Sequence, residues 1–96
     1  KAFSNVVLIE FPRKGTHAIA FVTGKTSGEL QRLTSDNHLK IFIPTTPNPT
    51  SGFIVFADPS EIIELDMTIE EGIKYVISGG IVSPEDIEKL IKNSSV

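Results

Sequence analysis

Short apolar runs separated by polar and turn-forming residues make up the first 65 residues of this 96-residue chain. Residues 6–11 (VVLIEF), 18–23 (AIAFVT), 39–43 (LKIFI) and 53–57 (FIVFA) are rich in β-branched and aromatic side chains, and each predicts a strand. Five residues, 12–16, connect the first two strands, so an antiparallel hairpin is the simplest pairing.

Two other segments have weaker patterns. Residues 24–38 are polar and contain two glycines, so we expect mostly loop, in which residues 29–33 could form one helical turn. Residues 61–66 (EIIELD) fit either a short edge strand or a helical turn, and we favour extended structure.

The clearest helix signal begins at Thr68. Thr68 and Glu71 have the spacing of an S/T-x-x-E capping box, in which each side chain accepts a hydrogen bond from the other residue's backbone N–H. Gly79-Gly80 predicts the end of this helix. Apolar residues at helical spacing give it one buried stripe: Ile69, Ile73, Val76 and Ile77.

A second C-terminal helix is predicted after Ser83, with Ser83 as N-cap and Pro84 at the first helical position. Ile87, Leu90 and Ile91 would form its apolar face, and residues 93–96 are expected to form a disordered tail.

Strands early in the chain and helices late indicate an α+β fold. We predict one domain over residues 1–96, built on a small, mostly antiparallel sheet of four to five strands with two C-terminal helices. The bulky core residues are expected to be the six phenylalanines: Phe3, Phe11, Phe21, Phe42, Phe53 and Phe56.

Residues 44–52 (PTTPNPTSG), here called the proline loop, are the most distinctive segment of the chain. Their three prolines fix φ and remove backbone donors, so the loop is expected to be stiff. Its hydroxyl groups and free carbonyls are then expected to face a ligand or a partner.

Composition and charge narrow the class of protein. A net charge of −3 argues against a nucleic-acid partner, because the densest basic spot is only Arg13-Lys14. The absence of cysteine excludes disulfides and thiolate metal sites. No apolar run reaches the roughly 18–20 residues that span a bilayer. The chain begins at Lys1 and its only methionine is Met67, so we expect a fragment of a longer protein.

No pattern in the chain indicates catalysis. His17 and His38, the two histidines, lack metal-ligand spacing, and no G-x-S-x-G motif is present. Carboxylates gather at residues 61–71, but Glu70 and Glu71 are better explained at a helix N-terminus than as an acid–base pair. We therefore predict no catalytic residues, no metal ligands and no cofactor; enzymatic activity is left open, and a non-enzymatic role is favoured.

Three blocks of the chain resemble the DUF502 family. Residues 6–15 (VVLIEFPRKG) followed by 19–24 (IAFVTG) are similar to its first signature, and residues 42–53 (FIPTTPNPTSGF) are similar to its proline-rich signature. Residues 64–68 (ELDMT) through 77–82 (ISGGIV) are similar to the third. At Ala18 and Ala20 the chain departs from the aromatic and glycine usual in the family.

The resemblance implies a soluble C-terminal domain of a membrane-anchored protein, with transmembrane helices upstream and this domain on the cytoplasmic side. The family occurs in bacteria and archaea, and its plant relatives, the continuous vascular ring-like proteins, are linked to vascular patterning and endomembrane trafficking. The resemblance implies no established activity and therefore no catalytic residue to carry over.

Three hypotheses about function remain. The preferred one is a non-catalytic binding or assembly module, whose ligand is a protein partner or an anionic head group. Its candidate binding residues are Thr45, Thr46, Asn48, Thr50, Ser51, Arg13 and Lys14. The alternative is a small-ligand sensor or enzyme with a site between the proline loop and residues 61–66. The third is a loop that only braces a hairpin. The oligomeric state is left open.

Overall fold

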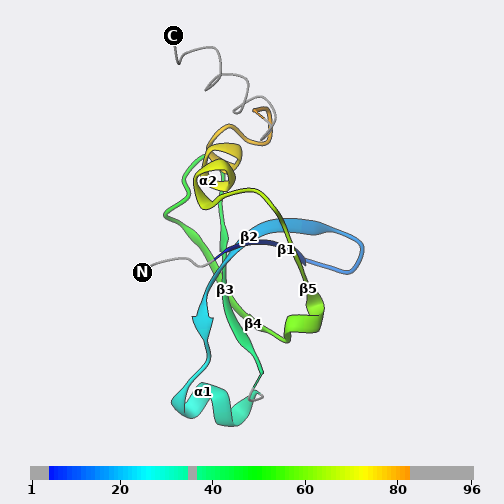
Figure 1. The fold of residues 1–96 in the computed structure, drawn as a ribbon, viewed down its shortest axis with the longest axis vertical. Helices are drawn as coiled ribbons and strands as arrows, with labels where there is room; N and C mark the ends of the chain where they lie inside the picture. The colour runs from blue at the N-terminus through cyan, green and yellow to red at the C-terminus, as the bar shows by residue number, and fades with distance from the viewer. Residues whose placement is uncertain (1–4, 35–36, 83–96) are drawn as a thin grey trace.

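The computed structural model describes residues 5–34 and 37–82, which form a five-stranded antiparallel sheet in the order β4-β3-β2-β1-β5 (Figure 1). Every neighbouring pair of strands is antiparallel, which confirms the α+β class and the predicted sheet. The strands are β1 (Asn5–Glu10), β2 (His17–Lys25), β3 (Leu39–Pro44), β4 (Gly52–Ala57) and β5 (Ile62–Glu64). The helices are α1 (Gly28–Leu33), α2 (Ile69–Ile77) and a 3-10 helix, η1 (Pro59–Glu61).

The helices test the prediction only in part. One C-terminal helix, α2, is present as expected, whereas the second one and the tail at 93–96 lie outside the described residues. Residues 24–38 are also less irregular than predicted. Strand β2 extends to Lys25 through a register shift next to Gly24, whose φ of +151° suits glycine, and α1 follows. The helical turn considered for residues 29–33 is present as α1, although none of its residues is buried.

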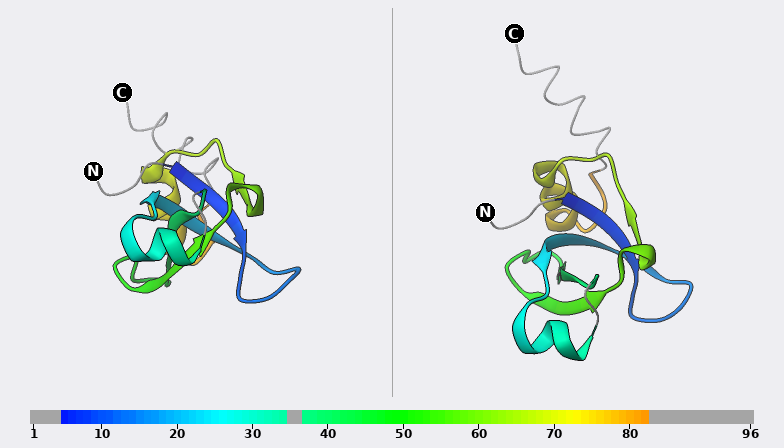
Figure 2. Two further views of the ribbon diagram at one scale, coloured as in Figure 1. Left: turned by 90° about the horizontal axis from the view of Figure 1, so that it is seen from below. Right: turned by 60° about the horizontal axis from the view of Figure 1, so that its bottom comes forward.

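The inner face of the sheet carries the main core. Its buried side chains are aliphatic and alternate along four strands: Val7, Ile9, Ala20, Val22, Ile41, Ile43 and Ala57. Two phenylalanines from strands that are not neighbours in the sheet meet at this face. The centroids of the Phe11 and Phe53 rings lie 5.2 Å apart. Phe11 follows β1 and Phe53 belongs to β4, and two strands lie between them in the sheet order. The sheet is therefore strongly curled (Figure 2).

Helix α2 covers part of the outer face. A Cβ at Gly72 would lie 3.2 Å from Phe21 Cε1 and 3.2 Å from Val6 Cγ2, so the helix backbone rests directly on these two buried side chains. Phe21 is fully buried there, as predicted. The expectation that the phenylalanines fill the core is wrong for Phe53, which is 55% exposed on the edge strand β4. Phe3 lies outside the described residues.

Candidate functional site

The proline loop is held together by its own side chains. Thr45 Oγ1 donates to the carbonyls of Asn48 (2.9 Å) and Ser51 (3.1 Å). Asn48 Oδ1 accepts from the backbone N–H (3.1 Å) and the hydroxyl (2.6 Å) of Thr50, and its Nδ2 donates to Ser51 Oγ (3.2 Å). These hydrogen bonds brace the loop, and the side chains that form them lie at the exposed surface of the domain.

The loop is also attached to helix α2. Thr46 Oγ1 donates to the backbone carbonyl of Val76, in the last turn of the helix. At the base of the loop, a Cβ on Gly52 would lie 2.0 Å from the carbonyl oxygen of Ile43, so only glycine fits this position. The loop is therefore fixed at its base by β3 and along its side by α2 (Figure 1).

An apolar cavity of about 390 Å³, here called the loop cavity, lies between the proline loop, α2 and the outer face of the sheet. Pro49 and Thr50 form its wall on the loop side, Ile73 comes from α2, and Phe21 and Phe42 come from the sheet. Four of these five side chains are apolar, which suits a hydrocarbon or aromatic group better than a charged one.

Exposed apolar side chains extend this surface on both sides. Ile54, the cross-strand partner of Phe42, is 66% exposed. Ile77, one helical turn after Ile73, is 48% exposed. Exposed apolar side chains next to a cavity can contribute to an interaction site.

The basic pair predicted to assist the loop lies elsewhere. Arg13 and Lys14 are exposed in the turn between β1 and β2, and neither lines the loop cavity. Figure 1 shows the tip of this hairpin on the side of the molecule away from the proline loop. Of the predicted loop residues only Thr50 lines the loop cavity with Ile73; Thr45, Thr46, Asn48 and Ser51 do not line it, and the basic pair lies elsewhere.

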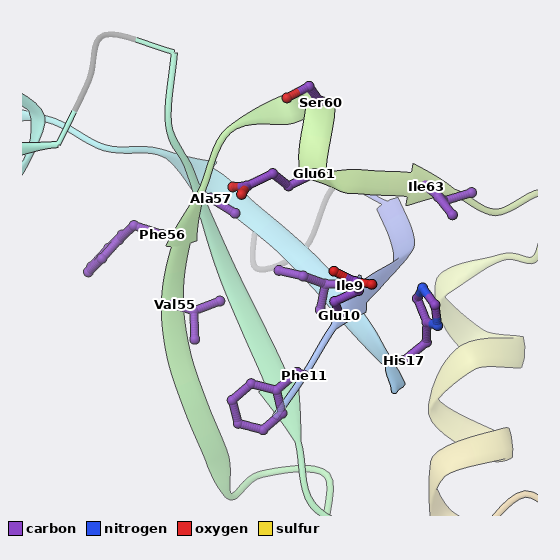
Figure 3. Close-up of a pocket in the computed structure, with 10 residues that line it drawn as sticks. All are labelled: Ile9, Glu10, Phe11, His17, Val55, Phe56, Ala57, Ser60, Glu61 and Ile63. Atoms are coloured by element: carbon purple, nitrogen blue, oxygen red, sulfur yellow. The ribbon is translucent and has the colours of Figure 1, made fainter. Parts of the chain in front are cut away.

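A second cavity of about 550 Å³, here called the mouth cavity, opens between β4 and the end of β1 (Figure 3). The side chains of Ile9, Phe11, Val55 and Ala57 give it an apolar floor. Its polar lining residues are Glu10, His17, Ser60 and Glu61.

The two cavities separate the segments on which the alternative hypothesis depends. Glu61 lines the mouth cavity and residues 49–50 of the proline loop line the loop cavity, and neither cavity contains both segments. In the described part of the chain no group of three His, Asp or Glu side chains could hold a metal ion. Glu71, from the same acidic region, accepts the Thr68 N–H at 2.9 Å in the predicted capping box, so its role is structural.

One carboxylate close to the mouth cavity has a perturbed pKa. The backbone N–H of Ser60 donates to Asp58 Oδ1 at 2.9 Å and, with the Ser60 hydroxyl, holds the pKa of Asp58 below its ordinary value of 3.8. The charge of His38 acts in the same direction. Asp58 is the N-cap of η1, and Glu61 completes a second capping box by accepting the Asp58 N–H at 3.1 Å.

Several residues of these cavities were not identified from the sequence as site residues. Ile73 was assigned only to the apolar stripe of a helix, and Pro49 only to the stiffness of the loop. Ile73 and Pro49 line the same cavity as Phe42 only because of how α2 packs on the sheet. The local sequence pattern does not show this packing. The Asp58–Glu61 capping box did have a signal, because the run Asp58-Pro59-Ser60-Glu61 carries an N-cap aspartate, a proline at the first position and a glutamate three residues later.

Fold and cavities together define a small α+β domain with a braced loop beside an apolar cavity. No helix in the two described ranges is long and apolar enough to cross a bilayer. The chain belongs to the family described as "Protein of unknown function (DUF502)", whose model matches residues 1–51.

Relatives from Arabidopsis thaliana match nearly the whole chain. Protein LIKE COV 1 is 30% identical over 93 residues, which are 96% of this chain and 35% of that protein. Protein CONTINUOUS VASCULAR RING 1 is 29% identical over 93 residues, again 96% of this chain and 34% of that protein. The chain thus spans about a third of the length of the curated relatives it matches. No solved structure matches it.

Proposed function

We propose that this domain is a non-catalytic binding module that receives an apolar side chain of a protein partner in the loop cavity. The observation that carries the proposal is the arrangement of Pro49, Thr50 and Ile73 around the apolar cavity, beside the exposed side chains of Ile54 and Ile77. The proline loop acts as a preformed wall, and its internal hydrogen bonds reduce the conformational entropy that binding would otherwise cost.

A protein partner fits the chemistry of the loop cavity better than an anionic head group does. The lining contains no Lys, Arg or His, and its polar contribution is Thr50. An anion would have to leave water without a compensating charge, which is unfavourable in an apolar site. A leucine or phenylalanine side chain gains roughly 1.5–3 kcal/mol from full burial.

The membrane context belongs to the same proposal. On this account the chain is the cytoplasmic part of a membrane-anchored protein, and binding in the loop cavity connects that protein to its partner. Support comes from membership of the family and from relatives about three times as long as this chain, which leaves room for further segments.

The test is an NMR titration of the 96-residue chain with N-acetyl-leucinamide and N-acetyl-phenylalaninamide, each in the millimolar range. We expect shifts at Thr50, Ile73 and Ile77, and loss of these shifts in the Ile73→Ser variant. Lys74→Ser, at an exposed neighbouring position on α2, is the matched control and should bind as the parent chain does.

Inositol hexakisphosphate, added separately, distinguishes the rival ligand class. Shifts confined to Arg13 and Lys14 with this probe, together with no response to the apolar amides, would replace the proposal by an anion-binding one. Unchanged binding in Ile73→Ser would also contradict it.

A further inference from the structure

The chain leaves helix α2 through a turn that keeps it at the end of the helix. Gly79 and Gly80 take the left-handed backbone conformation that commonly ends helices, with φ values of +69° and +87°. The backbone N–H of Val82 then donates to the hydroxyl oxygen of Ser78, the C-cap of α2, at 3.0 Å. Val82, the last residue of the described range, is therefore held at the C-terminal end of α2.

Exposed apolar side chains lie at this end of the helix. Ile81 is 83% exposed, and Ile77, the last residue of α2, is 48% exposed. Ile77 lies one helical turn after Ile73, which lines the loop cavity. The loop cavity and the exit of the chain therefore share one helix, with uncovered isoleucines at its end.

The sequence that follows carries an apolar pattern of its own. In residues 83–96, here called the C-terminal segment, Ile87, Leu90 and Ile91 have i, i+3, i+4 spacing and are here called the C-terminal stripe. Glu88 and Lys89 occupy positions between them, so a helix over these residues would be amphipathic. An apolar face of this kind is stable against other apolar surface rather than against water. These residues lie outside the described ranges.

The connection is long enough for the C-terminal stripe to reach the loop cavity. Ile87 follows Val82 by five residues, which span at most roughly 17 Å when extended and roughly 11 Å if the chain is helical from Pro84 onward. Either length is comparable with or larger than the diameter of an α-helix, about 10–12 Å, so Ile87 can pass α2 on either side. A tether this short gives the stripe a millimolar effective concentration at the cavity.

We propose that the C-terminal segment occupies the loop cavity of its own chain and places a side chain of the C-terminal stripe between Pro49 and Ile73. The apolar lining suits these side chains as it suits those of a protein partner. The inference rests on the function proposed above, because it concerns the same cavity, and it adds regulation to that function. A partner binds only by displacing the segment, so its apparent affinity is reduced by the fraction of chains in which the cavity is closed.

Paramagnetic relaxation enhancement measures this contact in the whole 96-residue chain. The chain has no cysteine, so Ser94→Cys provides a unique attachment site for a nitroxide label. We expect the label to broaden the NMR signal of Thr50, on the loop side of the cavity, and to leave that of Lys14 sharp. Lys14 lies in the β1–β2 turn, on the side of the molecule away from the proline loop (Figure 1). In an Ile87→Ser/Leu90→Ser background, the same label should leave Thr50 sharp as well.

A binding measurement without the label tests the regulation. The affinity for N-acetyl-phenylalaninamide should rise at least about twofold in Ile87→Ser/Leu90→Ser, because a cavity closed in more than half of the molecules at least doubles the apparent Kd. Glu88→Ser/Lys89→Ser is the matched control. It introduces two serines into the same segment without changing the net charge of −3, and it should bind the amide as the parent chain does.

Three results would overturn the inference. The first is a Thr50 signal that the nitroxide leaves sharp, and the second is equal broadening of Thr50 in the parent chain and in an Ile87→Ser/Leu90→Ser variant with a native-like spectrum. The third is broadening that arises only between a labelled chain and a separate isotope-enriched chain, which would assign the contact to a second copy. If the double variant does not fold, Leu90→Ser alone is measured against the same criterion.

The inference and the proposed function fail separately. The nitroxide measurement contains no added ligand, so it decides the docking of the C-terminal segment even if neither amide binds. Amide shifts at Thr50 and Ile73 without any nitroxide effect, or an equal amide affinity in Ile87→Ser/Leu90→Ser, would remove the inference and keep the proposed function. Nitroxide broadening of Thr50 with no amide binding, even in that variant, would keep the docking and remove the partner-binding function.

Discussion

At the scale of single residues, the side chains of Thr45 and Asn48 make most of the hydrogen bonds that hold the proline loop in its conformation. Their side chains form hydrogen bonds within the loop, so the hydroxyl-rich composition has a structural role beside the predicted contacts with a ligand. The sequence predicted where the loop lies. It could not predict the direction of these side chains, because that depends on distances between residues three to six positions apart in the folded loop.

Replacing Asn48 should therefore loosen the loop. Asn48→Ala removes two hydrogen bonds accepted from Thr50 and one donated to Ser51, and we expect about 1 kcal/mol of destabilisation, reduced by the exposure of the site. Urea unfolding measures the loss, and broadened NMR signals at Thr45 and Thr50 would report the loosening.

Ser27→Ala is the control for this variant, since Ser27 is exposed and makes no side-chain capping bond in the structure. It should change stability by less than about 0.5 kcal/mol. Sharp, unshifted loop signals in Asn48→Ala would show that the prolines alone hold the loop.

Asp58 makes stability depend on acid pH. Its folded-state pKa is lowered by the hydrogen bonds from Ser60 and by the charge of His38, so the unfolded chain binds the proton more readily than the folded chain. The contribution of Asp58 is complete above its unfolded pKa near 3.8 and is lost as the pH falls through the lower folded value.

Unfolding midpoints measured between neutral pH and about pH 2.5 test this linkage. Asp58→Asn retains an N-cap acceptor but cannot titrate, and its stability should fall less steeply in that acid range than that of the parent chain. Parallel acid profiles for the two proteins would remove Asp58 as a source of the pH dependence.

At the scale of elements, a helix or strand was predicted correctly where its local sequence pattern was strong. The strands β1 to β4 carry β-branched runs, and α2 carries both a capping box and an apolar stripe, so all five were predictable. β5 was ambiguous because it has only three residues and pairs with a single neighbour. α1 was indicated only weakly, as one possible turn at residues 29–33, because it buries no side chain and burial is what creates a periodic pattern.

The docking of α2 depends on Gly72. The helix approaches Val6 and Phe21 so closely that even a Cβ at this position would be in tight contact, at 3.2 Å. Gly72→Leu should therefore destabilise the domain by roughly 2 kcal/mol through overpacking and should displace Ile73 from the loop cavity. Chemical denaturation gives the first quantity, and loss of binding to N-acetyl-leucinamide gives the second.

Lys74→Leu, which adds the same side chain at an exposed position of α2, is the matched control. It should alter stability by no more than about 0.5 kcal/mol and should leave binding unchanged. Equal free energies of unfolding for the Gly72→Leu variant and the parent chain would mean that α2 can shift on the sheet without cost. The claim that the packing of α2 fixes the shape of the loop cavity would then be wrong.

At the scale of the whole molecule, the curled sheet separates two surfaces. Its inner side opens at the mouth cavity between β4 and β1, whereas the loop cavity lies on the outer side beneath α2. The sequence indicated the sheet and the loop, but both cavities arise from contacts between residues far apart in the chain, such as Phe11 with Phe53 and Thr46 with Val76. Such contacts leave no periodic signal.

The most direct test of the central claim is a measurement of intermolecular NOEs between N-acetyl-phenylalaninamide and the 96-residue chain. We expect NOEs from the ligand ring to the methyl groups of Ile73 and Ile77 and to the Thr50 side chain, which would place the ring in the loop cavity. NOEs to Val55 or Ile63 instead, or a bound ligand without contacts to α2, would contradict the assignment of the proline loop as the recognition element.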